Sequence, residues 1–146
     1  MLGRLFGIAL VVLGLGVYAD DSADRYRAVT QHPFDDVLAD INFAISQHNF
    51  RITGGNHIGG AIGERLGKSF PRSEIIHFCN LEYARRMLEA APDNLLHMPC
   101  KIVVYERNGE VVIETQLLPE HDANIGALNA EINGMLREIV DYAAQP

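Results

Sequence analysis

The segment CKIVVYERNGEVVIETQLLP, residues 100–119, limits the fold of this chain more than any other stretch. Two runs rich in Val, Ile and Tyr flank Arg-Asn-Gly, and Asn-Gly supplies the positive φ that both central residues of a tight hairpin turn require. Asn108 and Gly109 are therefore predicted to join two antiparallel strands. A chain with this hairpin needs an antiparallel sheet and a hydrophobic layer to cover it.

Helical periodicity supplies that layer. Residues 33–49 and 81–91 and a long terminal segment, 122–144, each place apolar residues on one stripe, and Asn80 is predicted to be the N-cap of the second helix. The predicted element order is β, α, β, short α, β, α, β, β, α. Helices with one apolar stripe need a common surface, so we expect the α+β class: a mostly antiparallel sheet with helices packed on one face.

Length and charge set the limits on domain count and partners. A chain of 146 residues is long enough for one domain with a proper core and too short for two ordinary ones. The formal net charge of -7 excludes a basic patch large enough to neutralise several phosphates. We therefore expect no nucleic-acid partner, and no binding to anionic membrane surfaces.

The N-terminal segment is typical of export. MLGR is a short positive region, LFGIALVVLGLG is an apolar run, and VYA puts small residues where a signal peptidase reads, so residues 1–19 are predicted to be a signal peptide. The apolar run is short for a membrane span, and a retained membrane anchor is the weaker alternative. A short linker is expected at residues 20–25 and a single domain at 26–146, in the periplasm or secreted.

Several motifs together resemble one known family. FDDVLADINFAISQHNFRI, IIHFCNLEYARRMLEAAP, LLHMPCKIVVYERNGEVVIETQLLP and the terminal helix, from about Tyr26 to Ala144, resemble the domain-of-unknown-function family 302. The resemblance implies a compact α+β fold and a homodimer that exchanges β-structure between its subunits. It implies no activity and no catalytic residue. The two cysteines are similar to those of an exported, cysteine-containing branch of that family.

The only two cysteines are predicted to form a disulfide, because two thiols in a small exported domain usually pair. Cys79 ends one predicted strand and Cys100 begins another, so neighbouring strands can bring their Cα atoms within the roughly 4.4 to 6.8 Å that a disulfide tolerates. Closing this loop of about 22 residues would stabilise the fold by roughly 3 kcal/mol. Two alternatives stay open: inert buried thiols, and an exchangeable redox disulfide, which needs one exposed thiol with a lowered pKa.

A third alternative for the same residues is a metal or haem site. His77, Cys79, His97 and Cys100, with Met98 behind them, form a soft donor set suited to copper(I), zinc or a haem iron. His77 and Cys79 are predicted to point to the same face of a strand. The dense spacing of known metal motifs is missing, so we expect no cofactor unless this set binds a metal or haem.

The glycine-rich stretch GGNHIGGAIGERLGK is the second candidate site. It follows a predicted strand and precedes a short helix, the context in which an anion binds at a helix N-terminus, although it matches no phosphate-loop motif. Gly54, Gly55, Arg65 and Lys68 are its predicted ligand-binding residues. The alternative is a flexible or closely packed connection.

Catalytic motifs are scarce: no G-x-S-x-G elbow is present, and no serine has an evident base beside it in sequence. We expect a non-enzymatic exported domain that acts as a homodimer, in ligand binding or as a partner of other envelope proteins. The rival hypothesis is a periplasmic metal, haem or thiol redox protein that uses the Cys/His cluster. An enzyme that uses the glycine-rich loop is the third.

Overall fold

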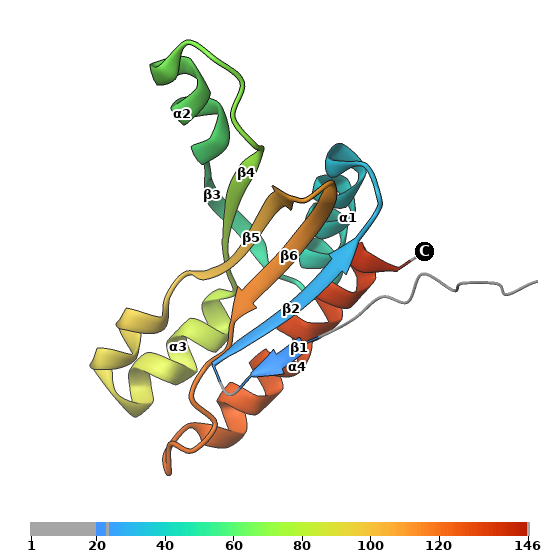
Figure 1. Ribbon diagram of the computed structural model, residues 1–146. Helices are drawn as coiled ribbons and strands as arrows, with labels where there is room; N and C mark the ends of the chain where they lie inside the picture. Colours follow the sequence, from blue (N-terminus) through green and yellow to red (C-terminus); the bar gives the residue numbers. More distant parts are fainter. Residues whose placement is uncertain (1–19, 23, 146) are drawn as a thin grey trace, which may run out of the picture.

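An antiparallel sheet organises the residues that the computed structural model describes, 20–22 and 24–145 (Figure 1). Its six strands there run in the order β1-β2-β6-β5-β4-β3. The strands are β1 (Asp20–Ser22), β2 (Arg25–Thr30), β3 (Arg51–His57), β4 (Ser73–Cys79), β5 (Cys100–Arg107) and β6 (Glu110–Gln116). The helices are α1 (Phe34–Gln47), α2 (Ile58–Leu66), α3 (Leu81–Ala90) and α4 (Gly126–Ala144), with a 3-10 helix, η1 (Pro92–His97), after α3. The prediction of a single α+β domain with an antiparallel sheet is confirmed.

The predicted hairpin is present at the centre of the sheet. Strands β5 and β6 pair antiparallel, with Arg107 opposite Glu110. Asn108 and Gly109 between them have φ values of 55° and 80°. Positive φ at both turn residues is what the tight hairpin needs, and it explains why this dipeptide occupies the turn.

One face of the sheet is buried beneath α1 and α4 (Figure 1). Ala28, Ile113 and Val104 lie side by side on β2, β6 and β5, and each is 0% exposed. Val37 and Ile41 of α1 fill the same core from the helical side. Since side chains alternate along a strand, the residues between these buried ones face the opposite, uncovered side of the sheet.

Helix α4 is held to the preceding loop by a buried asparagine that the apolar stripe of the sequence did not indicate. The Asn133 side chain accepts a hydrogen bond from the Leu118 backbone N–H at 2.8 Å and donates to the Leu118 carbonyl at 2.9 Å. It also donates to a Glu120 carboxylate oxygen at 2.7 Å. These three bonds position the strand-to-helix connection against α4.

Residues 51–72, here named the arm, comprise β3, α2 and the turn into β4, and their helix extends away from the body (Figure 1). Every residue of β3 is exposed, and Gly59 is the one buried residue of α2. A Cβ on Gly59 would lie 2.3 Å from the Pro71 carbonyl oxygen, so only glycine permits this approach of α2 to the chain entering β4. Helix α2, the predicted short helix for which no apolar stripe was expected, therefore does not join the helices on the sheet face.

The N-terminal region differs from the predicted linker. Residues 20–22 form β1, which pairs with the start of β2, and β2 begins at Arg25. The predicted signal peptide, residues 1–19, lies outside the described residues. Among the helices of residues 20–22 and 24–145, none combines the length and apolarity that crossing a bilayer requires.

Replacing Asn133 with alanine is expected to destabilise the fold by roughly 2 to 4 kcal/mol, because it leaves the buried Leu118 N–H and carbonyl without partners. The free energy of unfolding, measured by urea denaturation, checks this value. Asn42→Ala is the matched control, since Asn42 is exposed on α1, and it should change stability by less than about 0.5 kcal/mol. Equal stability of the two variants would contradict the role assigned to Asn133.

Candidate functional site

Cys79 and Cys100 lie at the same end of two neighbouring strands, as the sequence predicted. Cys79 is the last residue of β4 and Cys100 is the first of β5. Both are free thiols in this structure, so the predicted disulfide is not formed. The register explains the difference: Phe78, not Cys79, stands opposite Cys100, so the two cysteines are offset by one residue.

Both cysteine residues nevertheless line one small cavity of about 20 Å³. The wall comes from β4, α3, the start of β5, the chain before β5, and α4. Its lining residues are Phe50, Cys79, Asn80, Tyr83, Ala84, Met87, His97, Met98, Cys100, Leu118 and Ile132. Four of these side chains carry sulfur, and we name this space the sulfur-lined cavity.

Asn80 fixes the α3 side of this cavity. Its Oδ1 accepts hydrogen bonds from the backbone N–H groups of Glu82 at 2.9 Å and Tyr83 at 3.4 Å, which confirms the predicted N-cap. Its Nδ2 donates to the Asn49 carbonyl at 3.1 Å, which ties α3 to the chain before β3. Capping begins the helix directly after Cys79, and the helix then carries Tyr83 and Met87 to the cavity one turn apart.

A second, larger cavity of about 260 Å³ shares part of this wall. Its lining includes His77, His97, Met98, Cys100 and Lys101, but not Cys79. The Nε2 of His77 lies 3.1 Å from Oδ1 of Asn56, and its Nδ1 is buried without a hydrogen-bond partner among the described residues. This volume is below the roughly 300 to 1,000 Å³ of pockets that hold drug-sized ligands, so the cavity suits a smaller molecule than haem.

The structure thus divides the predicted metal set between two adjoining cavities. His97 and Cys100, with Met98, line both, whereas His77 lines only the larger cavity and Cys79 only the smaller one. Within the described part of the chain, no three His, Cys, Asp or Glu side chains are grouped closely enough to hold a metal ion. The four predicted residues are therefore neighbours that do not form a single tetrahedral cluster.

The glycine-rich residues do not form a phosphate loop. Gly54 and Gly55 belong to β3 and pair with His77 and Ile76, because the strand continues beyond its predicted end. Arg65 and Lys68 lie at the far end of α2, whose nine residues separate them from the glycines by about 13 Å of helix axis. The structure does not bring these four residues together.

Burial controls the chemistry of the thiols. It raises the pKa of Cys79 above its ordinary value of 9.0, and it raises the pKa of Cys100 to about 12, where the nearby Cys79 adds to the effect. Both side chains are therefore protonated and weakly nucleophilic at neutral pH. The lowered pKa that an exchangeable redox disulfide requires is absent from both.

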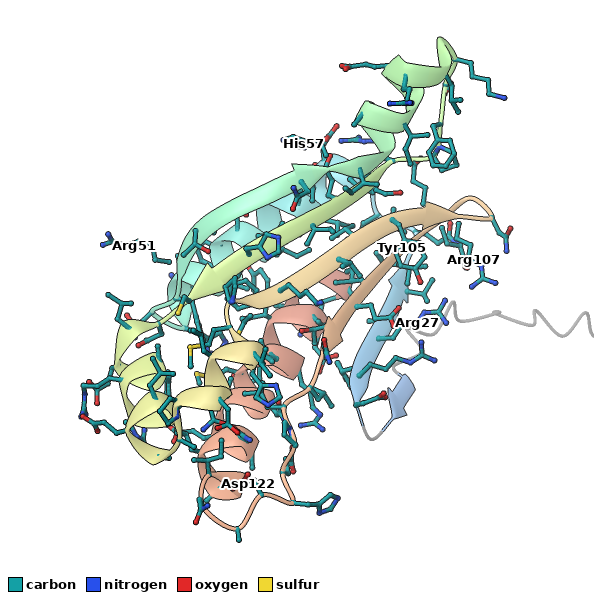
Figure 2. The ribbon with its side chains drawn as sticks, turned by 90° about the vertical axis from the view of Figure 1, so that its left-hand side faces the viewer. Arg27, Arg51, His57, Tyr105, Arg107 and Asp122 are labelled. Atoms are coloured by element: carbon teal, nitrogen blue, oxygen red, sulfur yellow. The ribbon has the colours of Figure 1, made fainter. Side chains whose placement is uncertain are left out.

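The uncovered face of the sheet carries residues that the sequence reasoning missed. Arg27, Tyr105 and Arg107 point away from α4 on this face (Figure 2). The Tyr105 hydroxyl donates to a Glu114 carboxylate at 3.2 Å, and Arg25 pairs with the same carboxylate at 3.3 Å. Strand alternation in RYRAVT and CKIVVYER was the available signal, since it places these basic and aromatic side chains opposite the buried ones.

Alkylation of Cys100 by iodoacetamide at pH 8 is expected to be about a thousandfold slower in the folded protein than in urea, because a pKa near 12 leaves little thiolate. Its rate should still rise with each pH unit above pH 9. Peptide mass mapping of timed samples gives the rates of both cysteines, with Cys79 as the internal reference. Equally fast labelling of Cys100 in the folded and unfolded protein would contradict the burial of its thiol in the folded state.

Comparison with known proteins identifies the family and not an activity. The crystal structure of an uncharacterized conserved DUF302 protein from Bacillus stearothermophilus superposes with a TM-score of 0.72 and 21% sequence identity, covering 83% of this chain and 98% of that chain. At this identity the likeness shows the fold alone. No curated protein matches the sequence.

The family model described as domain of unknown function DUF302 matches residues 26–142. This range contains all the helices but the last two residues of α4, and every strand except β1 and the first residue of β2. The resemblance seen in the sequence is confirmed over this range. The chain belongs to the DUF302 family.

Proposed function

We propose that this domain is a non-enzymatic binding module that acts as a homodimer, in which the arm of each copy is covered by the other. This proposal rests mainly on the exposure of large apolar side chains along the arm. Ile52, Ile58, Leu66 and Phe70 are between 40% and 53% exposed. Apolar residues gathered in this way on one projecting element mark an interaction surface.

The arm lacks the packing that normally stabilises a helix. Helix α2 has nine residues, and a helix this short is marginal in water without tertiary contacts. Contact with a partner would supply the missing burial. The adjoining strand β3 is an edge strand, and its outer side offers backbone groups to which a further strand can pair.

A second copy of the chain is the partner that we favour. Two copies related by a two-fold axis would place β3 against β3 and the two α2 helices over one another's apolar side chains. The arm carries four basic residues and one acidic residue, so apolar contact and strand pairing, and not charge pairing, would hold the two copies together: Arg51, Arg65, Lys68, Arg72 and Glu64. The homodimer with exchanged β-structure that the family resemblance implies agrees with this arrangement.

The site of action that we propose is outside the cytoplasmic membrane, as the export-like residues 1–19 indicate. There the dimer would bind a small ligand or other envelope proteins. The larger cavity, with His77, His97 and Lys101 in its lining, is the place for a small polar or anionic ligand.

Light scattering after size-exclusion chromatography is expected to give twice the mass of the chain for the purified protein. The double variant Leu66→Glu, Phe70→Glu should be monomeric, because it puts two charges into the apolar surface of the arm. Leu81→Glu is the matched control, since Leu81 is 82% exposed on α3, outside the arm, and this variant should stay dimeric. A monomeric parent protein, or a dimeric arm variant, would contradict the proposal.

A further inference from the structure

The sulfur-lined cavity is large enough for a single atom-sized guest. Its volume is about 20 Å³, and a space of about 10 to 15 Å³ is the least that holds one water. Cys79, Met87, Met98 and Cys100 reach it from β4, α3, the chain before β5, and β5 itself. Four separate segments of the fold thus each contribute one sulfur-containing residue to the lining of this cavity.

Water is a poor guest for this cavity. Phe50, Leu118 and Ile132 supply apolar wall, and a buried water needs two to four polar partners. The polar side chains of the wall are largely engaged elsewhere: Asn80 caps α3, and the Tyr83 hydroxyl donates to Glu131 at 2.6 Å. A guest that bonds to sulfur matches this wall better than one that needs hydrogen bonds.

We propose that the sulfur-lined cavity is a copper(I) site, in which the sulfur atoms of Cys79 and Cys100 bind one ion and Met98 or Met87 adds a thioether. Soft thiolate and thioether ligands select copper(I). Each thiol loses its proton on binding, so one copper(I) ion and two thiols give a dithiolate complex of charge -1 and two released protons. No oxidation or reduction takes place in this step.

The donor set also argues against zinc. A structural zinc site uses four nitrogen, oxygen or thiolate ligands in a tetrahedron. The described residues provide no group of even three His, Cys, Asp or Glu side chains at this point. Copper(I) is satisfied by two or three sulfur ligands, so the two cysteines and a neighbouring methionine suffice.

Proton release makes the affinity depend on pH. The titratable groups in the cavity wall are Cys79, Cys100, Tyr83 and His97. Burial raises the pKa of both thiols, so copper(I) must displace protons that are firmly held at neutral pH.

The test uses the reduced protein under anaerobic conditions, with copper(I) supplied as its acetonitrile complex and bathocuproine disulfonate as the competing chelator. We expect one copper(I) per chain. Cys79→Ser and Cys100→Ser should each lower the affinity at least about 100-fold, and Met98→Leu by about tenfold. Met135→Leu is the matched control, because Met135 is partly buried on α4 and does not line the cavity, and it should bind as the parent protein does.

Three results of the copper titrations would overturn the copper(I) site. They are substoichiometric copper in the parent protein, equal affinity of the parent and both serine variants, and one ion per two chains. Circular dichroism shows whether the serine variants are folded. If they are not, Met98→Leu, which conserves side-chain volume, serves as the test of the site. X-ray absorption that finds two or three sulfur neighbours around copper supports the site, and nitrogen or oxygen neighbours alone overturn it. The site lies within one chain, so its test does not depend on the dimer.

Discussion

Alternation of side chains along β4, β5 and β6 is the constraint on which the rest of the structure depends. Ile76 and Phe78, Ile102 and Val104, and Ile113 all point to the side that α1 and α4 cover. Moving any of these strands by one residue would turn its apolar side chains to the uncovered face. The same alternation carries Cys100 to the covered side, and this places a thiol under the sheet instead of in solvent.

The elements whose signals are local could be predicted from the sequence. The turn at Asn108 and Gly109 requires positive φ, and few dipeptides other than Asn-Gly supply it. Asn80 caps α3 through its own backbone neighbours, so its role needs no knowledge of the distant chain. An apolar stripe predicted α4, and the structure buries every residue of it: Ile125, Leu128, Ile132, Leu136, Ile139, Val140 and Ala143.

Features that depend on contacts far apart in the chain could not be predicted. Strand β3 continues through Gly54 and Gly55 because β4 pairs with it, and glycine has little strand preference of its own. Asn133 is a polar residue on a buried helix face, and its partner, Leu118, is fixed only after the loop has folded. The cysteines were correctly placed on adjacent strands, but a one-residue difference in register decides whether they stand directly opposite one another.

In the candidate site, too, the features set by local sequence could be predicted and those set by long-range contacts could not. The sequence identified Cys79, His97, Met98 and Cys100 as neighbours, since their positions at strand ends are readable from local patterns. The sequence offered no sign that Met87 lines the same cavity, because a methionine on the apolar stripe of a helix is normally a core residue. It also offered no sign that His77 would line a different cavity. The sequence therefore identified most of the candidate donor residues. Their division between the two cavities follows from the path of the backbone.

Gly59 gives the arm one further property. Its missing side chain lets α2 begin directly against the backbone of Pro71 and Ser73, at the point where the chain returns to the sheet. The start of the helix therefore depends on a contact between two backbones, to which the side chains of His57 and Arg72 add bonds to Glu74 and Asp35. Substitutions on the outer surface of α2 would leave this close backbone approach in place, so the side chains exposed there can change without moving the point at which the helix begins.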